Sequence, residues 1–433
     1  MSIITDPHYK LHRTKGGAAN LSQPRVLVVG DAVAPTGFAR VTESILERLC
    51  SKYEFFHLGL NYKGDPHDLK WKVYPAGLNG DPYGMNRLEE LIRKIHPHLI
   101  FLIGDLWTLM QYAGILARLS DRPPTVAYFP VESDPVEPRT MVYLLPAIDH
   151  LVTYTHFGER EIQQAINIAC ALKPDVPTRR LSVIGHGVDR QVFFPLLGSN
   201  QLTESRLAAR KILFSNRPDL HDAFIILNAN RNQPRKRIDT TMEAFALFSK
   251  DKPENVKLYL HMARQDQGWD IQCLADRFNI RERLIVTRED NELCDLSPAL
   301  LNQVYNACDV GINTSSSEGW GLVSFEHAAT GAAQIVPRHT ALTELWEDAA
   351  EFVEPSFSVI SEQILTRAYF TSPQDIASAM QHLYEDPNHR QHLSLVAFQR
   401  ACEPRMDWSN LAIQWDQIFS SQLRQLTHQP VSG

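Results

Sequence analysis

The two carboxylates with the clearest chemical signal are Glu318 and Glu326, eight positions apart in the stretch TSSSEGWGLVSFEHAATG. The strand-like run DVGINT leads into a glycine-rich loop that holds Glu318, and a helix pattern follows with Glu326 about two turns inside it. Free amide groups at the start of a helix bind anions, and Gly319 and Gly321 allow a ligand to approach the main chain. The two acids could then accept hydrogen bonds from hydroxyls on either side of a phosphate, as a nucleotide sugar requires. The alternative is that Glu318 caps the helix and Glu326 faces solvent.

Two cations follow another strand, in the stretch NANRNQPRKRIDTTMEAFALF. Arg231 and Lys236 lie on the turn between the strand and a helix that begins near Asp239. Charge-assisted hydrogen bonds from such groups contribute about 1.5–3 kcal/mol each, so the pair could neutralise a diphosphate. The alternative is a solvated basic loop, which is common on protein surfaces.

A third candidate is Gly37, at the start of the first helix in GDAVAPTGFAR. Backbone amides there could face a phosphate or an acceptor. The stretch lacks the G-x-G-x-x-G spacing of a dinucleotide site, so NAD is not expected. A simple tight turn is the alternative.

These stretches lie in a regular alternation of short apolar runs and helix patterns. Continuous apolar strands of this kind indicate parallel sheets that are covered on both faces. In the first half, the expected strands are RVLVVG, LIFLIG, TVAYFP, LVTYT and LSVIG, and in the second half they begin with AFIILNA, VKLYLH, LIV, DVGINT and AAQIVP. A polar stretch at 195–222, expected to be irregular, separates the halves. Because ligands collect at the carboxyl ends of such strands, two facing domains would enclose a site between them.

Length and composition set outer limits on this interpretation. A chain of 433 residues exceeds the usual size of one hydrophobic core, so two domains are expected. The net charge of −7 disfavours a general nucleic-acid binder. The six scattered cysteines are interpreted as reduced thiols, and the chain has no apolar run long enough for a signal core or a membrane span. A cytoplasmic protein is expected, with peripheral membrane contact possible.

Three sequence blocks together resemble a known family. NRNQPRKRID, YNACDVGINTSSSEGWGLVSFEHAATGA and VIGHGVDRQVFFP are similar to the signature blocks of the retaining GT-B glycosyltransferases related to glycogen synthase and bacterial mannosyltransferases. Glu318 and Glu326 match the E-x7-E element of that family, and Arg231 and Lys236 match its Arg-x4-Lys pair. The resemblance implies an α/β GT-B fold with two doubly wound Rossmann-like domains facing a central cleft. The expected units are an acceptor domain (1–197), a donor domain (198–404), and a helix with a loose tail (405–433) that packs back on the first domain.

The resemblance also implies a role for each matched residue. Arg231 and Lys236 would stabilise the leaving diphosphate, and Glu318 would hold hydroxyls of the transferred sugar. The remaining donor contacts would come from Glu326 at the ribose and from amides at or near Gly319, Trp320, Gly321, Leu322 and Val323. Neither a metal nor a cofactor is expected, since cations and helix dipole would serve in place of a metal. The donor would be a UDP- or GDP-sugar.

The chain departs from the family pattern in its first half. Relatives carry a histidine after the strand TVAYF that helps to position the sugar, whereas this chain has PVESDP. Glu132 could make that contact instead. Asp105, at the end of the strand in FLIGDLW, could touch the acceptor, although a helix cap is an equal alternative.

The sequence therefore predicts a metal-independent glycosyltransferase that retains anomeric configuration. Two alternatives stay open: an inactive nucleotide-sugar-binding scaffold or subunit, which the missing histidine motivates, and a GT-B epimerase. The acceptor stays open among a glycan, a lipid-linked sugar, a small metabolite, a protein and a modified nucleic acid.

Overall fold

The computed structural model describes residues 23–78, 80–287, 296–361 and 365–427. Cys294, most of the tail and the N-terminal segment lie outside the described residues. The five described cysteines are free. Within the described part of the chain, no helix is both long and apolar enough to cross a membrane.

The first domain is built on a seven-stranded parallel sheet in the order β3-β2-β1-β4-β5-β6-β7. Its strands are β1 (Arg25–Asp31), β2 (Glu54–Leu60), β3 (Lys72–Pro75), β4 (Leu99–Ile103), β5 (Thr125–Phe129), β6 (His150–Thr153) and β7 (Arg180–Val183). Its helices are α1 (Gly37–Leu49), α2 (Met85–Ile95), α3 (Leu106–Leu116), α4 (Pro138–Leu144) and α5 (His156–Leu172). Strands β4, β5 and β6 are buried along their whole length, as expected for a sheet covered on both faces.

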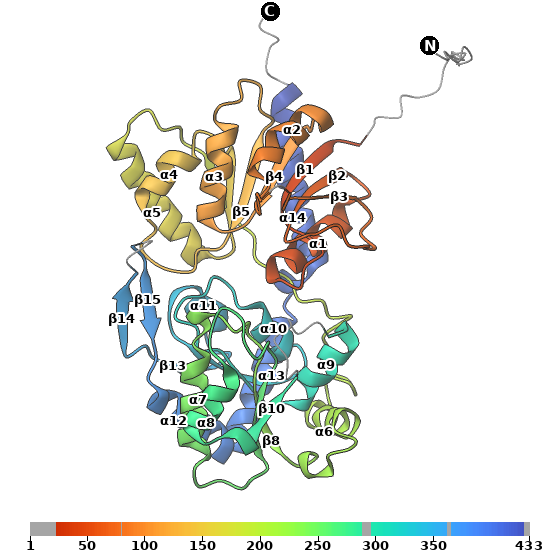
Figure 1. Ribbon diagram of the computed structural model, residues 1–433, viewed down its shortest axis with the longest axis vertical. Helices are drawn as coiled ribbons and strands as arrows, with labels where there is room; N and C mark the ends of the chain where they lie inside the picture. The colour runs from red at the N-terminus through yellow and green to blue at the C-terminus, as the bar shows by residue number, and fades with distance from the viewer. Residues whose placement is uncertain (1–22, 79, 288–295, 362–364, 428–433) are drawn as a thin grey trace, which may run out of the picture.

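The second domain repeats this architecture with a six-stranded parallel sheet in the order β10-β9-β8-β11-β12-β13 (Figure 1). Its strands are β8 (Phe224–Asn228), β9 (Val256–Leu260), β10 (Leu284–Val286), β11 (Val310–Ile312), β12 (Ala333–Pro337) and β13 (Glu351–Val353). Its helices are α6 (Leu202–Leu213), α7 (Ile238–Ser249), α8 (Ile271–Phe278), α9 (Pro298–Ala307), α10 (Leu322–Ala328), α11 (Thr340–Trp346), α12 (Pro373–Glu385) and α13 (Pro387–Ala401). The antiparallel hairpin of β14 (Phe357–Ile360) and β15 (Arg367–Phe370) stands beside this sheet. Short 3-10 turns complete the chain: η1 (Pro218–Leu220), η2 (Pro234–Lys236), η3 (Arg281–Arg283) and η4 (Pro404–Met406).

The stretch between the two sheets contains α6, so the expectation of an irregular segment at 195–222 is wrong. The buried face of α6 consists of Ser205, Ala209 and Arg210 rather than large apolar side chains. Arg210 donates to the carbonyl of Ala307 at 2.8 Å and pairs with Asp309. A helix that buries a cation and small residues has no apolar periodicity, and this explains why the pattern did not reveal it.

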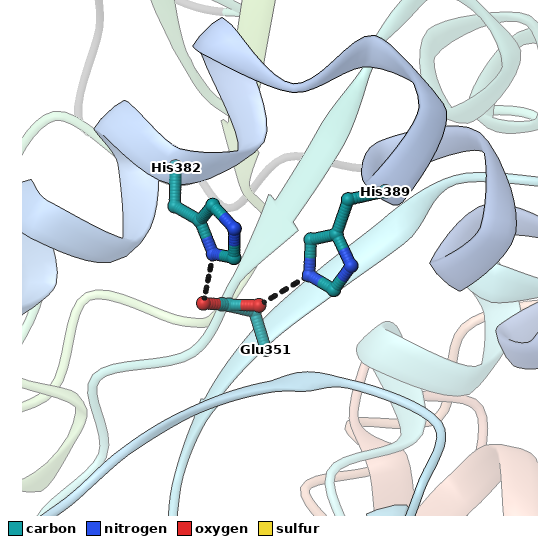
Figure 2. A group of neighbouring side chains, drawn as sticks. All are labelled: Glu351, His382 and His389. Atoms are coloured by element: carbon teal, nitrogen blue, oxygen red, sulfur yellow. Dashed lines mark hydrogen bonds and ion pairs between the residues drawn. The ribbon is translucent and has the colours of Figure 1, made fainter.

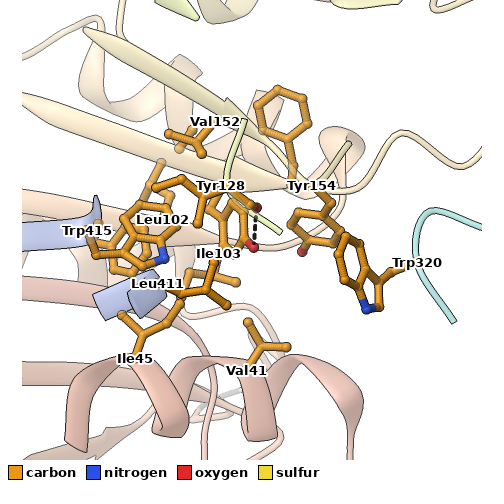
Figure 3. Close-up of a cluster of buried hydrophobic side chains, with 14 of the residues drawn as sticks. Val41, Ile45, Leu102, Ile103, Tyr128, Val152, Tyr154, Trp320, Leu411 and Trp415 are labelled. Carbon is orange, nitrogen blue, oxygen red and sulfur yellow. Dashed lines mark hydrogen bonds between the residues drawn. The ribbon is translucent and has the colours of Figure 1, made fainter. Parts of the chain in front are cut away.

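The last helix, α14 (Trp408–Thr427), returns to the first domain (Figure 1). Trp415 is fully buried, with ring centroids 4.9 Å from Phe101 and 4.7 Å from Tyr128. Figure 3 shows Trp415 in this cluster, together with Trp320 from the second domain. Apolar packing of α14 therefore joins the end of the chain to the first sheet.

Candidate functional site

The functional side chains of the second domain follow two neighbouring strands. η2 comes after β8, and the loop with Glu318 comes after β11, which lies directly beside β8 in the sheet. Because parallel strands point the same way, both segments emerge at one edge of the sheet. This explains how residues 82 positions apart come into contact.

Lys236 and Glu318 form a buried ion pair at this edge. Both residues are more than nine-tenths buried, and the Lys236 ammonium donates to Oε2 of Glu318. Ser315 and Asn313 donate to the same oxygen at 3.2 and 3.5 Å, while Arg235 approaches Oε1 at 3.7 Å. Burial by itself raises the pKa of Glu318, but the charges of Lys236 and Arg235 outweigh it and lower that pKa to about 2. Glu318 is therefore ionised at neutral pH.

A loop of the first domain covers this pair. Arg235 forms an ion pair with Glu132 at 2.9 Å, and the Glu318 amide donates to the Glu132 carbonyl at 3.2 Å. A Cβ atom on Gly319 would lie only 2.7 Å from Cβ of Pro130, so the contact with the first domain requires glycine there. Burial raises the pKa of Glu132, Arg235 opposes the rise, and the neighbouring acids Asp105 and Glu318 add to it.

The start of α10 is shaped by backbone rather than by a side-chain cap. Gly321 precedes the helix with φ of 85°, in the left-handed region that favours glycine, and no side-chain cap bond is present. The alternative that Glu318 caps this helix is therefore wrong. Leu322 and Val323 are the first helical residues, and a Cβ on Gly37 would lie 3.3 Å from the Leu322 side chain. Gly37 thus lies against the start of α10, across the domain boundary.

Trp320 is occupied by packing against the first domain. A Cβ on Gly185 would lie 2.6 Å from its ring, and the His186 ring centroid lies 5.0 Å away. His186 is buried and bonded to the Tyr128 hydroxyl at 2.9 Å, which is a structural position. The Trp320 side chain therefore packs at the boundary between the domains. Of this residue, the main-chain amide remains as a candidate contact for the donor.

Glu326 is buried one turn into α10, not two as the sequence pattern predicted. Its Oε1 accepts from Arg40 of the first domain at 2.7 Å, and its Oε2 accepts from Tyr305 at 3.0 Å. The alternative in which Glu326 faces solvent is wrong. Neither Arg40 nor Tyr305 carried a sequence signal, because their relevance depends on how the two domains meet.

Arg231 is paired with an acid of its own domain. Its guanidinium forms two hydrogen bonds with Asp266, at 2.5 and 3.2 Å, and its side chain is 41% exposed. Of the run Arg235–Arg237, the structure instead brings Arg235 and Lys236 to Glu318. The alternative of a solvated basic loop is therefore wrong for Arg235 and Lys236.

Three acids of the first domain follow neighbouring strands. Asp31 ends β1, Asp105 follows β4, and Glu132 follows β5, and these strands are adjacent in the sheet. Asp31 accepts hydrogen bonds from Thr36 at 2.6 Å and from Asn61 at 3.0 Å. Burial raises the pKa of Asp31 and of Asp105. Asp105 precedes α3 without a side-chain cap bond, so its carboxylate does not serve as that cap. The position of Asp31 at the end of a buried strand was the signal that could have found it.

Thr340, the first residue of α11, has an unusual backbone conformation. Its φ of 44° lies in the left-handed region, which is uncommon for a β-branched residue. Its hydroxyl donates to the Glu318 carbonyl at 3.0 Å, and His339 beside it bonds to the Ser315 carbonyl at 2.8 Å. Two consecutive residues at the start of α11 therefore hold the loop that carries Glu318 at two of its carbonyl groups.

Two parallel-sheet domains joined by a returning helix, with charged residues at facing strand ends, define the GT-B class of fold. In a comparison with protein families, residues 210–400, which make up most of the second domain, match the model of the family Glycosyl transferases group 1.

Curated relatives match about half of the chain. A D-inositol 3-phosphate glycosyltransferase of Geodermatophilus obscurus is 26% identical over 238 residues, which are 53% of this chain and 47% of that protein. The serotype-specific mannosyltransferase WbdA of Escherichia coli is 26% identical over 216 residues, which are 48% of this chain and 25% of that protein. The matches thus span about half or less of the length of these relatives.

Solved structures resemble the whole two-domain arrangement. Sucrose-phosphate synthase from Thermosynechococcus elongatus superposes with a TM-score of 0.68 at 17% identity, over 93% of this chain and 99% of the other. The Anabaena protein HepE, in complex with UDP and glucose, has a TM-score of 0.66 at 16% identity, over 92% and 100% of the two chains. At these identities the likeness establishes the GT-B fold.

Proposed function

We propose that this chain is a glycosyltransferase that moves a sugar from a nucleoside-diphosphate sugar to a hydroxyl of an acceptor, with retention of anomeric configuration and without a metal. The observation that carries the proposal is the buried Lys236–Glu318 pair, with Arg235 beside it, at strand ends that face the acids of the first domain. The family of residues 210–400 supports the reaction type.

The groups of this site would contact the sugar, the diphosphate and the ribose of the donor in turn. Oε2 of Glu318 already has three donors, whereas Oε1 is approached only loosely by Arg235, so Oε1 is the oxygen we assign to sugar hydroxyls. The diphosphate would lie against Lys236 and the amides at the start of α10. The ribose would reach Glu326 only by sharing or displacing its bonds to Arg40 and Tyr305. Arg231 would need to leave Asp266 to reach the diphosphate.

The reaction would proceed by loss of the nucleoside diphosphate. The bond between the anomeric carbon and the diphosphate oxygen breaks, and the cations stabilise the charge that develops on that oxygen. The acceptor hydroxyl attacks the oxocarbenium-like carbon from the same face, and its proton passes to a phosphate oxygen of the leaving group. No enzyme nucleophile is needed in this scheme.

The acids of the first domain narrow the acceptor class. Asp31, Asp105 and Glu132 follow adjacent strands, and carboxylates there would accept hydrogen bonds from hydroxyls and repel phosphate. We therefore assign a neutral or cationic acceptor that carries hydroxyls. Release of nucleoside diphosphate should be stimulated more by neutral sugars than by the same sugars as phosphate esters, and the reverse order would contradict this assignment.

The second candidate is a nucleotide-sugar-binding scaffold. Two observations favour it. The chain lacks the family histidine after the strand TVAYF, and Glu132 in that stretch pairs with Arg235. Radiolabelled UDP- and GDP-sugars separate the two candidates: steady release of nucleoside diphosphate, even to water, requires an enzyme, whereas tight binding without turnover supports the scaffold.

The donor base can be tested without knowing the acceptor. A ligand that binds only the folded state raises stability by RT ln(1 + [L]/Kd), which is about 2.7 kcal/mol at a hundredfold excess over Kd. We expect UDP or GDP to raise the unfolding temperature more than ADP does. If none of the three changes it, the donor site is wrongly assigned.

A further inference from the structure

A group of three possible metal ligands lies in the second domain, outside the site described above. Glu351 is the first residue of β13, His382 is in the last turn of α12, and His389 is in the first turn of α13. Figure 2 shows both imidazole rings directed at the Glu351 carboxylate from the two helices. Among the described residues, these three offer ligand atoms that all lie within 4.8 Å of one another.

The distances suit one shared ion. Nδ1 of His382 lies 2.9 Å from Oε1 of Glu351, and Nε2 of His389 lies 2.9 Å from Oε2. Nitrogen and oxygen ligands about 2.0–2.2 Å from a tetrahedral zinc lie about 3.3–3.5 Å apart, so small side-chain movements would bring the group to that geometry. The two rings are nearly parallel, with centroids 4.4 Å apart.

The charges around the group favour a cation. With both histidines neutral, the carboxylate and the two imidazoles can all bind one metal ion, whereas two adjacent imidazolium rings would repel each other. Asp386 adds negative charge beside both histidines, and its Oδ1 accepts from the amides of Asn388 and His389 at 3.0 and 2.9 Å. These bonds fix the start of α13 and hence the position of His389.

We propose that Glu351, His382 and His389 bind a divalent transition-metal ion, with Zn²⁺ as the reference ion. Two imidazoles and one carboxylate are typical zinc ligands, whereas Mg²⁺ and Ca²⁺ prefer oxygen ligands alone. The side chains of His382, His389 and Glu351 are 51%, 30% and 19% exposed, so water can complete the coordination.

The position of the group assigns the ion a structural role. Glu351 lies at the amino end of a strand that runs parallel to β12, and β12 runs parallel to β11. Glu318 follows the carboxyl end of β11. The metal group and the donor site therefore lie at opposite ends of the parallel strands. The ion would join the edge strand β13 to the corner between α12 and α13 and would take no part in sugar transfer.

Titration of the EDTA-treated full chain with Zn²⁺ tests the proposal, with the unfolding temperature and calorimetry as readouts. We expect one saturable site and a rise in unfolding temperature that Mg²⁺ does not reproduce. His382→Ala, His389→Ala and Glu351→Gln should each weaken this site at least tenfold. His392→Ala is the matched control, because His392 is exposed on the same helix and lies outside the group.

Co²⁺ gives an independent readout of the ligands. In the wild type we expect visible d–d bands without thiolate charge-transfer absorption. These bands should be lost in the three ligand variants. Far-ultraviolet circular dichroism of the variants should match the wild type and so confirm that they are folded. Three results would overturn the proposal. The first is the wild-type band in both His382→Ala and Glu351→Gln, the second is thiolate absorption, and the third is the lack of a saturable zinc site below about 100 µM.

Discussion

The Lys236–Glu318 pair links function and stability at the scale of single residues. Deleting one partner of a buried ion pair leaves an uncompensated charge, which costs about 3–5 kcal/mol, whereas replacing both partners by neutral groups of similar size costs much less. Loss of activity in a single variant therefore does not by itself separate a donor-binding role from a folding role.

A paired substitution separates the two roles. We expect Lys236→Met to lower the free energy of unfolding by about 3 kcal/mol and the double variant Lys236→Met/Glu318→Gln to regain most of it, as measured by urea unfolding. Transfer should stay at least about a hundredfold below wild type in the double variant, since it lacks both donor contacts. Near-wild-type transfer in this stable variant would remove both residues from the mechanism.

The ionisation of Glu318 predicts a pH dependence of stability. Its pKa is about 2 in the folded chain against an ordinary value of 4.5, so Glu318 contributes stability that is present above pH 4.5 and is lost as the pH falls toward 2. At 1.36 kcal/mol per unit, the contribution is about 3 kcal/mol, of which about 2 is lost by pH 3. Between pH 6 and pH 3, urea unfolding should show that the wild type loses about 2 kcal/mol more stability than the double variant, which lacks the Glu318 carboxylate. A constant difference would mean that Glu318 is not ionised in the fold.

At the scale of elements, α14 is the clearest case of apolar packing between distant parts of the chain. Trp415, Leu411 and Phe419 of this helix are buried against the first domain, while Ile413 on the same helix is 58% exposed. The pattern of Trp408, Leu411, Trp415 and Ile418 in the sequence predicted a packing helix, and these residues are buried.

Truncation of Trp415 tests how much α14 contributes. Trp415→Ala should lower the free energy of unfolding by about 3–5 kcal/mol, because it opens a cavity among fully buried rings. Ile413→Ala should change it by less than about 0.5 kcal/mol, because exposed side chains contribute little. Equal effects of the two variants in urea unfolding would contradict the packing of α14 described here.

At the scale of the whole molecule, hydrogen bonds and ion pairs across the domain boundary hold the two sheets together. Glu344 on α11 accepts from the amides of His156 and Phe157 at the start of α5, at 2.9 and 2.7 Å. Asp134 of the first domain accepts from the Tyr369 hydroxyl at 2.6 Å on the hairpin. Two ion pairs, Arg40–Glu326 and Arg235–Glu132, add to these hydrogen bonds across the boundary.

Removal of Glu344 should loosen this arrangement. Glu344→Ala loses two charge-assisted hydrogen bonds to a helix start. Each contributes about 1.5–3 kcal/mol when it is buried, and less here because the Glu344 side chain is 28% exposed. We expect a larger radius of gyration by small-angle X-ray scattering, reversed in part by the nucleotide that stabilises the wild type. Glu347→Ala, at an exposed glutamate just after α11, is the control and should scatter as wild type does. An unchanged radius in Glu344→Ala would show that other contacts set the domain spacing.

The sequence by itself determined the parallel α/β architecture, because continuous apolar strands separated by helices can be buried only in covered sheets. It also placed Lys236 and Glu318 each after a strand, since a strand end is a local feature, whereas the sheet order of the structure made those two strands neighbours. It failed for α6, whose buried face is Ser205, Ala209 and Arg210, because burial through hydrogen bonds and an ion pair leaves no apolar period.

Only the tertiary structure decided which charges meet. Arg40 and Glu326 are 286 positions apart, and Arg235 reaches Glu132 across the domain boundary. The same holds for Glu351, His382 and His389, which come from one strand and two helices. Electrostatic contacts depend on distance in space, and the chain sets that distance only once both sheets and the helices around them have packed.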